Sequence, residues 1–272
     1  MKKDGTSEPA KPRKMVNRNT CNPLSLWCWF LTGLWGCTQT TLAGPPFITD
    51  DPEPVEFQHW EYYLASQHTR TKDGWTGLPA LIEINYGIIS NTQVHLIAPL
   101  AYDTPNQGPT HLGYGDTEIG LKYRFIQETP ERPQIGGFPL IEFPTGKTER
   151  NLGSGHIGTF LPLWLQKSWG QEDRKWTTYG GGGYHINPGA NNRDWTFLGW
   201  VLQRQITDKV LLGGEVYYHT PTQFHEEDET AFNLATIIDL SALHHILLSA
   251  GRSMDGPTEF QAYVAYQLTF GP

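Results

Sequence analysis

The chain has 272 residues, 38% of them hydrophobic, a formal net charge of −8 and a mean hydropathy of −0.45. After the N-terminal region, no stretch offers the roughly 20 consecutive apolar residues that a membrane-spanning helix needs, which excludes such helices from the rest of the chain. Aromatic residues at 12%, together with 29 glycines and 20 prolines, favour many short strands joined by turns.

The N-terminus is typical of a cleaved secretory signal peptide, which we place at residues 1–43. A basic and polar stretch covers residues 2–18, a short apolar run covers residues 23–37, and small residues close the segment at 41–43. Met15 is an alternative start that would give a signal of more ordinary length. The sequence therefore predicts an exported protein.

The cysteines and most of the excess basic charge precede the expected cleavage point. Cys21, Cys28 and Cys37 all lie before Ala43, so we expect no disulfide, no thiolate metal site and no cofactor in the mature chain. The residues that end in Cys37 also resemble a lipoprotein cleavage box, which leaves lipidation as an alternative. Beyond the cut remain 14 basic and 26 acidic residues, a formal charge of −12. Such an acidic exported protein is a poor candidate for binding nucleic acid.

Alternation with period two is the main signal from position 57 onward. Near residues 115–126, four charged side chains share the face opposite Ile119, Leu121 and Tyr123. Such a face cannot lie in a dry core, so it faces water or a wet lumen. We expect about twelve strands of the length that crosses a bilayer at a tilt, at 57–68, 77–88, 92–102, 115–126, 134–144, 157–168, 176–186, 195–205, 209–219, 231–239, 245–252 and 259–270.

These segments predict an all-β fold, a transmembrane antiparallel up-and-down β-barrel of about 12 strands over residues 57–272. An even count places both termini on the periplasmic side of a Gram-negative outer membrane, with outer-membrane lipid around the barrel. The last strand alternates up to Phe270, which is the usual signal for the barrel assembly machinery. A soluble β-sandwich with an aromatic core is the alternative fold.

Residues 44–56 form a proline-rich acidic arm before the first expected strand. Its prolines keep it out of the strand ladder. Asp50, Asp51 and Glu53 predict a solvated arm, with a divalent-cation site or a short plug in the lumen as the alternatives.

The sequence resembles a family of bacterial outer-membrane transporters known as the "MetA-pathway of phenol degradation" type. The likeness lies in GPPFITDDPEPV at 44–55 with HWEY at 59–62, and in FPTG at 143–146 with LGSG at 152–155. It extends over nearly all of the mature chain. The resemblance implies a channel-like barrel for small molecules, hydrophobic or aromatic compounds among them, and carries no established functional residues with it.

The inner faces of the expected strands supply the candidate site. We expect a polar lumen through which small solutes diffuse passively, with side chains of both signs selecting them. A lumen closed by salt bridges and hydrogen bonds, in a structural or binding barrel, is an equally weighted alternative. The candidate lining residues are Glu61, Glu83, Asn85, Asp116, Glu118, Lys122, Arg124, Glu142, Glu215, His219, Gln261 and Tyr263.

Other motifs carry weaker signals. The loop 225–229 holds ligand-type residues, yet a solvated charged loop explains it better than a metal site, and we expect no metal. The glycines at 180–183 indicate a bend or a close backbone approach in the barrel wall. A lipid hydrolase is the least favoured function, because neither Ser154 nor Ser249 stands in the context of an activated nucleophile. We therefore expect no enzyme.

Overall fold

The structure is a computed structural model in which residues 45–272 are described; the expected signal peptide lies outside them. Two short 3-10 helices accompany the strands, and no helix in the described range is long and apolar enough to cross a bilayer. The elements are β1 (Trp60–Thr71), β2 (Gly74–Ile89), β3 (Thr92–Pro105), β4 (His111–Tyr114), β5 (Thr117–Ile126), β6 (Gln134–Gly137), β7 (Leu140–Phe143), η1 (Thr148–Arg150), β8 (Gly158–Trp169), η2 (Glu172–Arg174), β9 (Trp176–Ile186), β10 (Trp195–Thr207), β11 (Val210–His219), β12 (Glu229–Asp239), β13 (His244–Asp255) and β14 (Thr258–Phe270).

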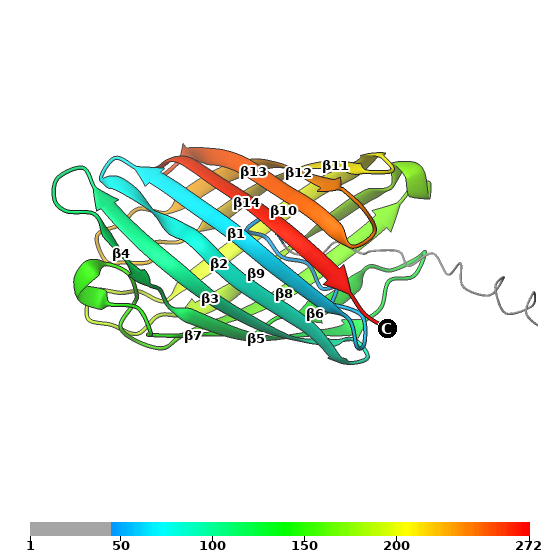
Figure 1. Cartoon of the computed structure of the whole chain (residues 1–272), viewed down its shortest axis with the longest axis horizontal. Coiled ribbons are helices and arrows are strands. Elements are labelled where there is room, and N and C mark those ends of the chain that lie inside the picture. Colours follow the sequence, from blue (N-terminus) through cyan, green and yellow to red (C-terminus); the bar gives the residue numbers. More distant parts are fainter. Residues whose placement is uncertain (1–44) are drawn as a thin grey trace, which may run out of the picture. The chain divides into compact units, whose positions relative to one another are not determined.

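The strands form one closed antiparallel barrel whose strands are tilted to its long axis (Figure 1). β4 and β5 are two halves of one broken strand against β3, and β6 and β7 are likewise two halves against β8. Counted this way, the segments make twelve strands. The ring closes where β1 pairs with β14 along its whole length, from Trp60 opposite Phe270 to Thr71 opposite Thr258. The expected twelve-stranded up-and-down barrel is confirmed.

One expected strand, 134–144, is interrupted, and β4 adds a short strand before the expected strand 115–126. Between β6 and β7, Pro139 has no N–H to donate to a ladder, so regular pairing stops there, although its carbonyl still accepts the N–H of Leu121 at 3.1 Å. Between β4 and β5, Gly115 still donates its N–H to the Pro99 carbonyl of β3 at 3.0 Å, and Asp116 belongs to neither strand. The wall is therefore least regular around β4 to β7.

The connections alternate in length only in part. The turns from β2 to β3, from β10 to β11 and from β12 to β13 are tight, whereas the connections from β3 to β4, from β7 to β8 and from β11 to β12 are long. The tight turns share an end with the C-terminus, the end that we expect to be periplasmic, and the opposite end is the outer end. The turns from β1 to β2 and from β13 to β14 are short although they lie at the outer end, and the connections from β5 to β6 and from β8 to β9 are longer than periplasmic turns usually are.

The two faces of each strand differ as the alternation predicts. On β12, Leu234 is 65% exposed while Asn233 and Ala235 beside it are buried. On β5, Leu121 and Tyr123 are exposed around the buried Lys122. The exposed apolar side chains form the outer surface that contacts lipid, and the polar side chains point inward.

Leu234→Arg tests this assignment of faces. We expect the substitution to lower the free energy of unfolding in lipid vesicles by about 2–4 kcal/mol, because a charge near the bilayer midplane is costly. Urea titration followed by tryptophan fluorescence measures it. Glu227→Arg, in the exposed loop before β12, is the matched control and leaves the midpoint unchanged. Equal midpoints for both variants and the parent protein would contradict the assignment.

Candidate functional site: the barrel interior and its N-terminal arm

The residues nominated from the sequence lie on the inner side of the barrel or at its rim. They come from six strands and the β4–β5 break, so only folding brings them together. Glu61, Glu83, Asn85, Lys122, Glu215 and Gln261 are buried, and Asp116, Glu118, Arg124, Glu142, His219 and Tyr263 are half-buried.

The N-terminal arm, residues 45–56, is folded into the barrel, and the expectation of a solvated arm is wrong. Thr49 and Asp51 are fully buried, with 0% of each residue exposed. The arm bonds to β3, β5, β11 and β13, strands on different sides of the ring. Figure 1 shows it in blue between the walls. Of the alternatives weighed from the sequence, the short plug is the one observed.

Ion pairs hold the acidic side chains of the arm against β5. Asp50 Oδ1 lies 2.9 Å and Asp51 Oδ1 lies 3.7 Å from Lys122 Nζ, and Glu53 Oε1 lies 3.0 Å from Arg124 Nη1. Among residues 45–272, the inner face of the barrel carries one lysine and one arginine, and they are Lys122 and Arg124. The arm is therefore inside because its carboxylates neutralise two enclosed cations, which would otherwise be buried without partners.

Three uncharged side chains, all glutamines, add hydrogen bonds to the same end of the arm. Glu53 Oε2 accepts from Gln134 Nε2 at 3.0 Å and from Gln166 Nε2 at 3.1 Å, and Gln93 Oε1 accepts from the Val55 N–H at 2.9 Å. Sequence reasoning missed these side chains, because an isolated glutamine on an inner face gives no signal of its partner.

The middle of the arm is held through its backbone. Glu215 accepts the N–H groups of Ile48 at 3.0 Å and Thr49 at 2.9 Å, and also the side-chain amide of Asn233 at 2.6 Å. Gly199 faces Thr49 so closely that any Cβ there would overlap its hydroxyl. Gly199 thus leaves room for the arm. A glycine inside a strand often marks the close approach of another part of the chain, so this position was a signal readable from the sequence.

An apolar slot takes the first aromatic ring of the arm. Phe47 packs edge-on against Tyr179 with centroids 6.4 Å apart, and Val201 and Ala235 complete the cluster. A Cβ on Gly213 would come within 2.9 Å of Phe47 Cζ. The slot thus fits a flat ring against a wall without a side chain.

A second polar network lies on the inner face of β2, β3 and β5. His95 Nδ1 lies 2.7 Å from Asn85 Oδ1, and His95 Nε2 lies 3.1 Å from Glu118 Oε1. Asn85 Nδ2 also donates to Glu83 Oε1 at 2.8 Å. These inward groups bond to one another across three strands, so this part of the wall is stiff and carries acidic charge.

Asp116 explains the motif FPTG…LGSG. Its carboxylate accepts the N–H of Gly146 at 2.8 Å, the N–H of Ser154 at 2.6 Å and the Ser154 hydroxyl at 2.8 Å. Gly153 has no room for a Cβ, which would overlap Asp116 Oδ1. The motif therefore fixes the loop between β7 and β8 onto the β4–β5 break at the outer rim.

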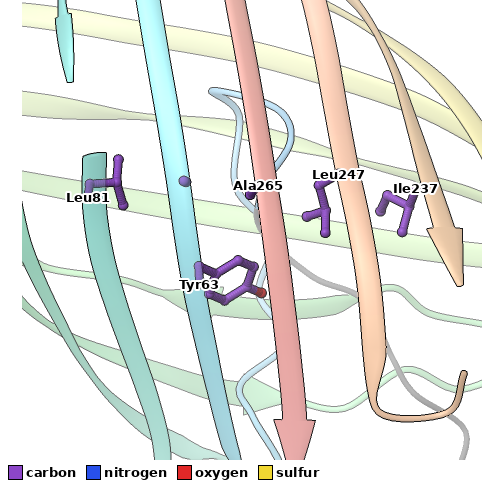
Figure 2. Close-up of a cluster of buried hydrophobic side chains, with 6 residues drawn as sticks. Tyr63, Leu81, Ile237, Leu247 and Ala265 are labelled. Carbon is purple, nitrogen blue, oxygen red and sulfur yellow. The ribbon is translucent and has the colours of Figure 1, made fainter. Parts of the chain in front are cut away.

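The inner face is more apolar than the expected polar lumen. One buried cluster spans β12, β13, β14, β1 and β2 and comprises Tyr63, Ala65, Leu81, Ile237, Leu247 and Ala265; Figure 2 shows its labelled members on neighbouring strands. A second buried cluster, which is mainly aromatic, comprises Phe138, Trp164, Phe197, Tyr217 and Ala231, with Leu140, Phe160 and Trp195 packed against it. Polar and apolar patches thus share the interior.

The aromatic cluster becomes more accessible toward the outer end. Trp164 is 1% exposed, whereas Phe160 and Trp195 nearer the outer ends of β8 and β10 are half-buried. Phe160 and Trp195 stack with centroids 6.1 Å apart, and Trp195 stacks on His185 at 4.8 Å. The glycines of β9 make this possible, since a Cβ on Gly183 would lie 2.6 Å from Phe160.

The other sequence signals have structural explanations. In the described range, no group of three or more His, Cys, Asp and Glu residues is placed to hold a metal ion. Glu229, at the end of the acidic loop, is buried and accepts hydrogen bonds from Ser253 and Thr258. Ser154 bonds to Asp116, and Ser249 donates to the Pro46 carbonyl at 2.7 Å.

One serine that the sequence reasoning did not nominate does contact a histidine. Ser66 Oγ lies 2.9 Å from His68 Nε2, and His68 Nδ1 lies 2.8 Å from the Tyr102 hydroxyl. The neighbouring Leu64 on the same face is 59% exposed, so this group is on the outer surface, toward the outer end of β1.

Comparison with known proteins agrees with the geometry. No family model matches the sequence, and no curated protein matches it. The fold is similar to the COG4313 outer membrane channel from Pseudomonas putida F1, with a TM-score of 0.65 and 15% identity over 81% of this chain and 98% of that one. It is also similar to the NanC porin, with a TM-score of 0.51 and 6% identity over 76% and 98%. The chain has an outer-membrane β-barrel fold.

Asp116→Ala tests the role of the Asp116 carboxylate at the rim. Three hydrogen bonds to a charged group are lost, each worth about 1.5–3 kcal/mol. We therefore expect trypsin to cleave after Lys147 or Arg150 roughly tenfold faster in the folded barrel. Asp73→Ala, in the turn between β1 and β2, is the control. An unchanged cleavage rate in Asp116→Ala would show that the loop is fixed by other contacts.

Proposed function

We propose that the protein is an outer-membrane channel for small molecules, suited to hydrophobic and aromatic compounds, whose arm closes the passage. The observation that carries this proposal is the inner aromatic wall with its half-buried outer rings, Phe160 and Trp195. Side chains that served only to fill the barrel would gain nothing from partial exposure, whereas accessible stacked rings offer a surface to a passing planar solute.

In this proposal the twelve inward residues line the passage beside the apolar clusters. Solutes diffuse passively through it. The C-terminal strand would serve the assembly machinery: Phe270 stacks on Tyr62 with centroids 5.5 Å apart on the outer face of β14 and β1. Outer-membrane lipid and a small solute are the partners.

The arm is the element whose movement would open the passage. It is attached by side chains and backbone N–H groups and, from 45 to 56, belongs to no strand. Its ion pairs to Lys122 and Arg124 exchange for water more easily than a strand ladder does, because ladder bonds break only cooperatively. A closed-lumen structural barrel differs from this proposal in keeping the arm fixed at all times.

Gly199→Ala tests the channel and the plug together. The Thr49 hydroxyl overlaps the position of a Cβ on residue 199, so a side chain there displaces the arm. In planar bilayers we expect this variant to conduct at least tenfold more than the parent protein. Gly137→Ala, where a Cβ would meet its nearest atom at 3.5 Å, is the matched control and conducts like the parent.

Two outcomes would count against the proposal. Equal conductance of Gly199→Ala and the parent protein would remove the arm from the gating role. No conductance and no solute flux into liposomes in any form would remove the channel and leave the closed-lumen barrel.

A lipid-ester hydrolase is a second candidate, favoured only by Ser66, His68 and Tyr102. The serine is in hydrogen-bonding reach of the imidazole, and a third group orients the other ring nitrogen, as an activated nucleophile requires. A tyrosine hydroxyl stands where a carboxylate is usual. The site faces lipid, where ester bonds are present.

Hydrolysis of a fluorogenic phospholipid by the purified protein in mixed micelles decides this candidate. We expect Ser66→Ala to abolish any turnover that depends on the site, while Ser249→Ala, whose hydroxyl bonds to the arm, keeps it. Absence of turnover by the parent protein dismisses the hydrolase.

A further inference from the structure

We propose that the place occupied by the arm is a binding site for arylalkyl carboxylates, and that such a solute releases the arm by competing with it. This inference deepens the proposed channel function and rests on it. The arm acts as a tethered occupant, and the groups that hold it define the ligand that can replace it.

The carboxylate requirement comes from Lys122 and Arg124. Their partners are the arm's own acids, at 2.9 Å for Asp50 and 3.0 Å for Glu53. With the arm seated, the Lys122 side chain is 3% exposed, so the carboxylates of the arm replace most of the water around its ammonium group, and their departure vacates a place for another anion. A solute carboxylate supplies that charge, whereas an alcohol does so poorly and an amine opposes it.

The aryl requirement comes from the Phe47 slot. Tyr179, Val201 and Ala235 form its walls, and Gly213 provides a flat side. Phe47 is 8% exposed when seated, so nearly its whole ring is removed from water. Burial of a phenyl group of this kind favours binding, and a vacated slot offers the same gain to a ligand ring.

The distance between the two subsites limits the ligand. Phe47 and Asp50 are three residues apart, so their backbones are separated by at most about 11 Å. This upper limit restricts the link between the ring and the carboxylate of the ligand to a short alkyl chain. The other inward carboxylates nearby, Glu61, Glu83 and Glu118, repel an anion, which confines it to the two cations that the arm releases.

Competition then links binding to opening. A ligand that binds only the arm-released state shifts the equilibrium toward that state by its own binding free energy. The arm's three carboxylates and its backbone bonds to Glu215 set the affinity that a solute must overcome. Millimolar solute concentrations are therefore the appropriate range for the test.

The release of the arm can be measured without transport. Thr49 is fully buried in the seated arm, so Thr49→Cys reacts slowly with a thiol reagent until the arm leaves. The expected mature chain has no other cysteine. We expect 4-phenylbutyrate to raise the labelling rate at least fivefold in a saturable manner, while 4-phenylbutanol, 4-phenylbutylamine and butyrate leave it within twofold.

Variants separate specific competition from general loosening. Lys122→Gln in the Thr49→Cys background labels quickly without ligand and loses the response to 4-phenylbutyrate. Lys167→Gln, a lysine on the outer face paired with Glu128, is the matched control and keeps the parent behaviour. Responses equal for the acid, alcohol and amine, or a full response in Lys122→Gln, would overturn the inference.

Labelling and conductance together distinguish a failure of the binding-site proposal from a failure of the channel proposal. Labelling that responds to the carboxylate in a protein without conductance would support the site and remove the channel. Conductance with no selective labelling response would keep the channel and remove the site.

Discussion

Closure of the sheet in lipid is the constraint on which the rest of the structure depends. Hydrocarbon offers no hydrogen-bond partner, so every backbone N–H and C=O in the spanning strands must be bonded within the protein. Pairing of β1 with β14 along their whole length removes the last free edge. Once the ring is closed, each strand has an apolar outer face and an enclosed inner one.

Closing the barrel separates the charged side chains of its inner face from bulk water, and the arm supplies their counter-charges. Lys122 and Arg124 point into a narrow interior where full hydration is impossible and where an unpaired charge is costly. The chain supplies counter-charges from its own N-terminal segment rather than from the opposite wall. Glu215 and Gly199 then fix the course of the arm by hydrogen bonding and by leaving room for it. The same contacts make the segment removable, because none belongs to a strand ladder.

The sequence predicted the barrel well because its signal is local. Strand positions, inward charges and tight turns follow from period-two alternation within ten residues, and β14 matched its expected range almost residue for residue. The strand break at Pro139 was also readable in principle, since proline cannot donate to a ladder.

The arm was misread because its partners are distant in sequence. Asp50 is 72 residues from Lys122, and Ile48 is 167 residues from Glu215. Prolines and carboxylates alone indicate solvation, and only the fold reveals the enclosed cations. The apolar inner clusters were missed for a different reason. Leu247 and Ile237 lie in runs of consecutive apolar residues, so alternation does not assign their side chains to either face.

Solid-state NMR in lipid bilayers would test most directly whether the arm neutralises the enclosed cations. With ¹⁵N on lysine side chains and ¹³C on aspartate carboxyls, dipolar recoupling reports the pairs that are in contact. The structure places Asp50 Oδ1 2.9 Å from Lys122 Nζ, and within the described chain the Lys–Asp ion pairs are those of Lys122. The account predicts strong dephasing that disappears in Lys122→Gln; no dephasing in the parent protein would contradict it.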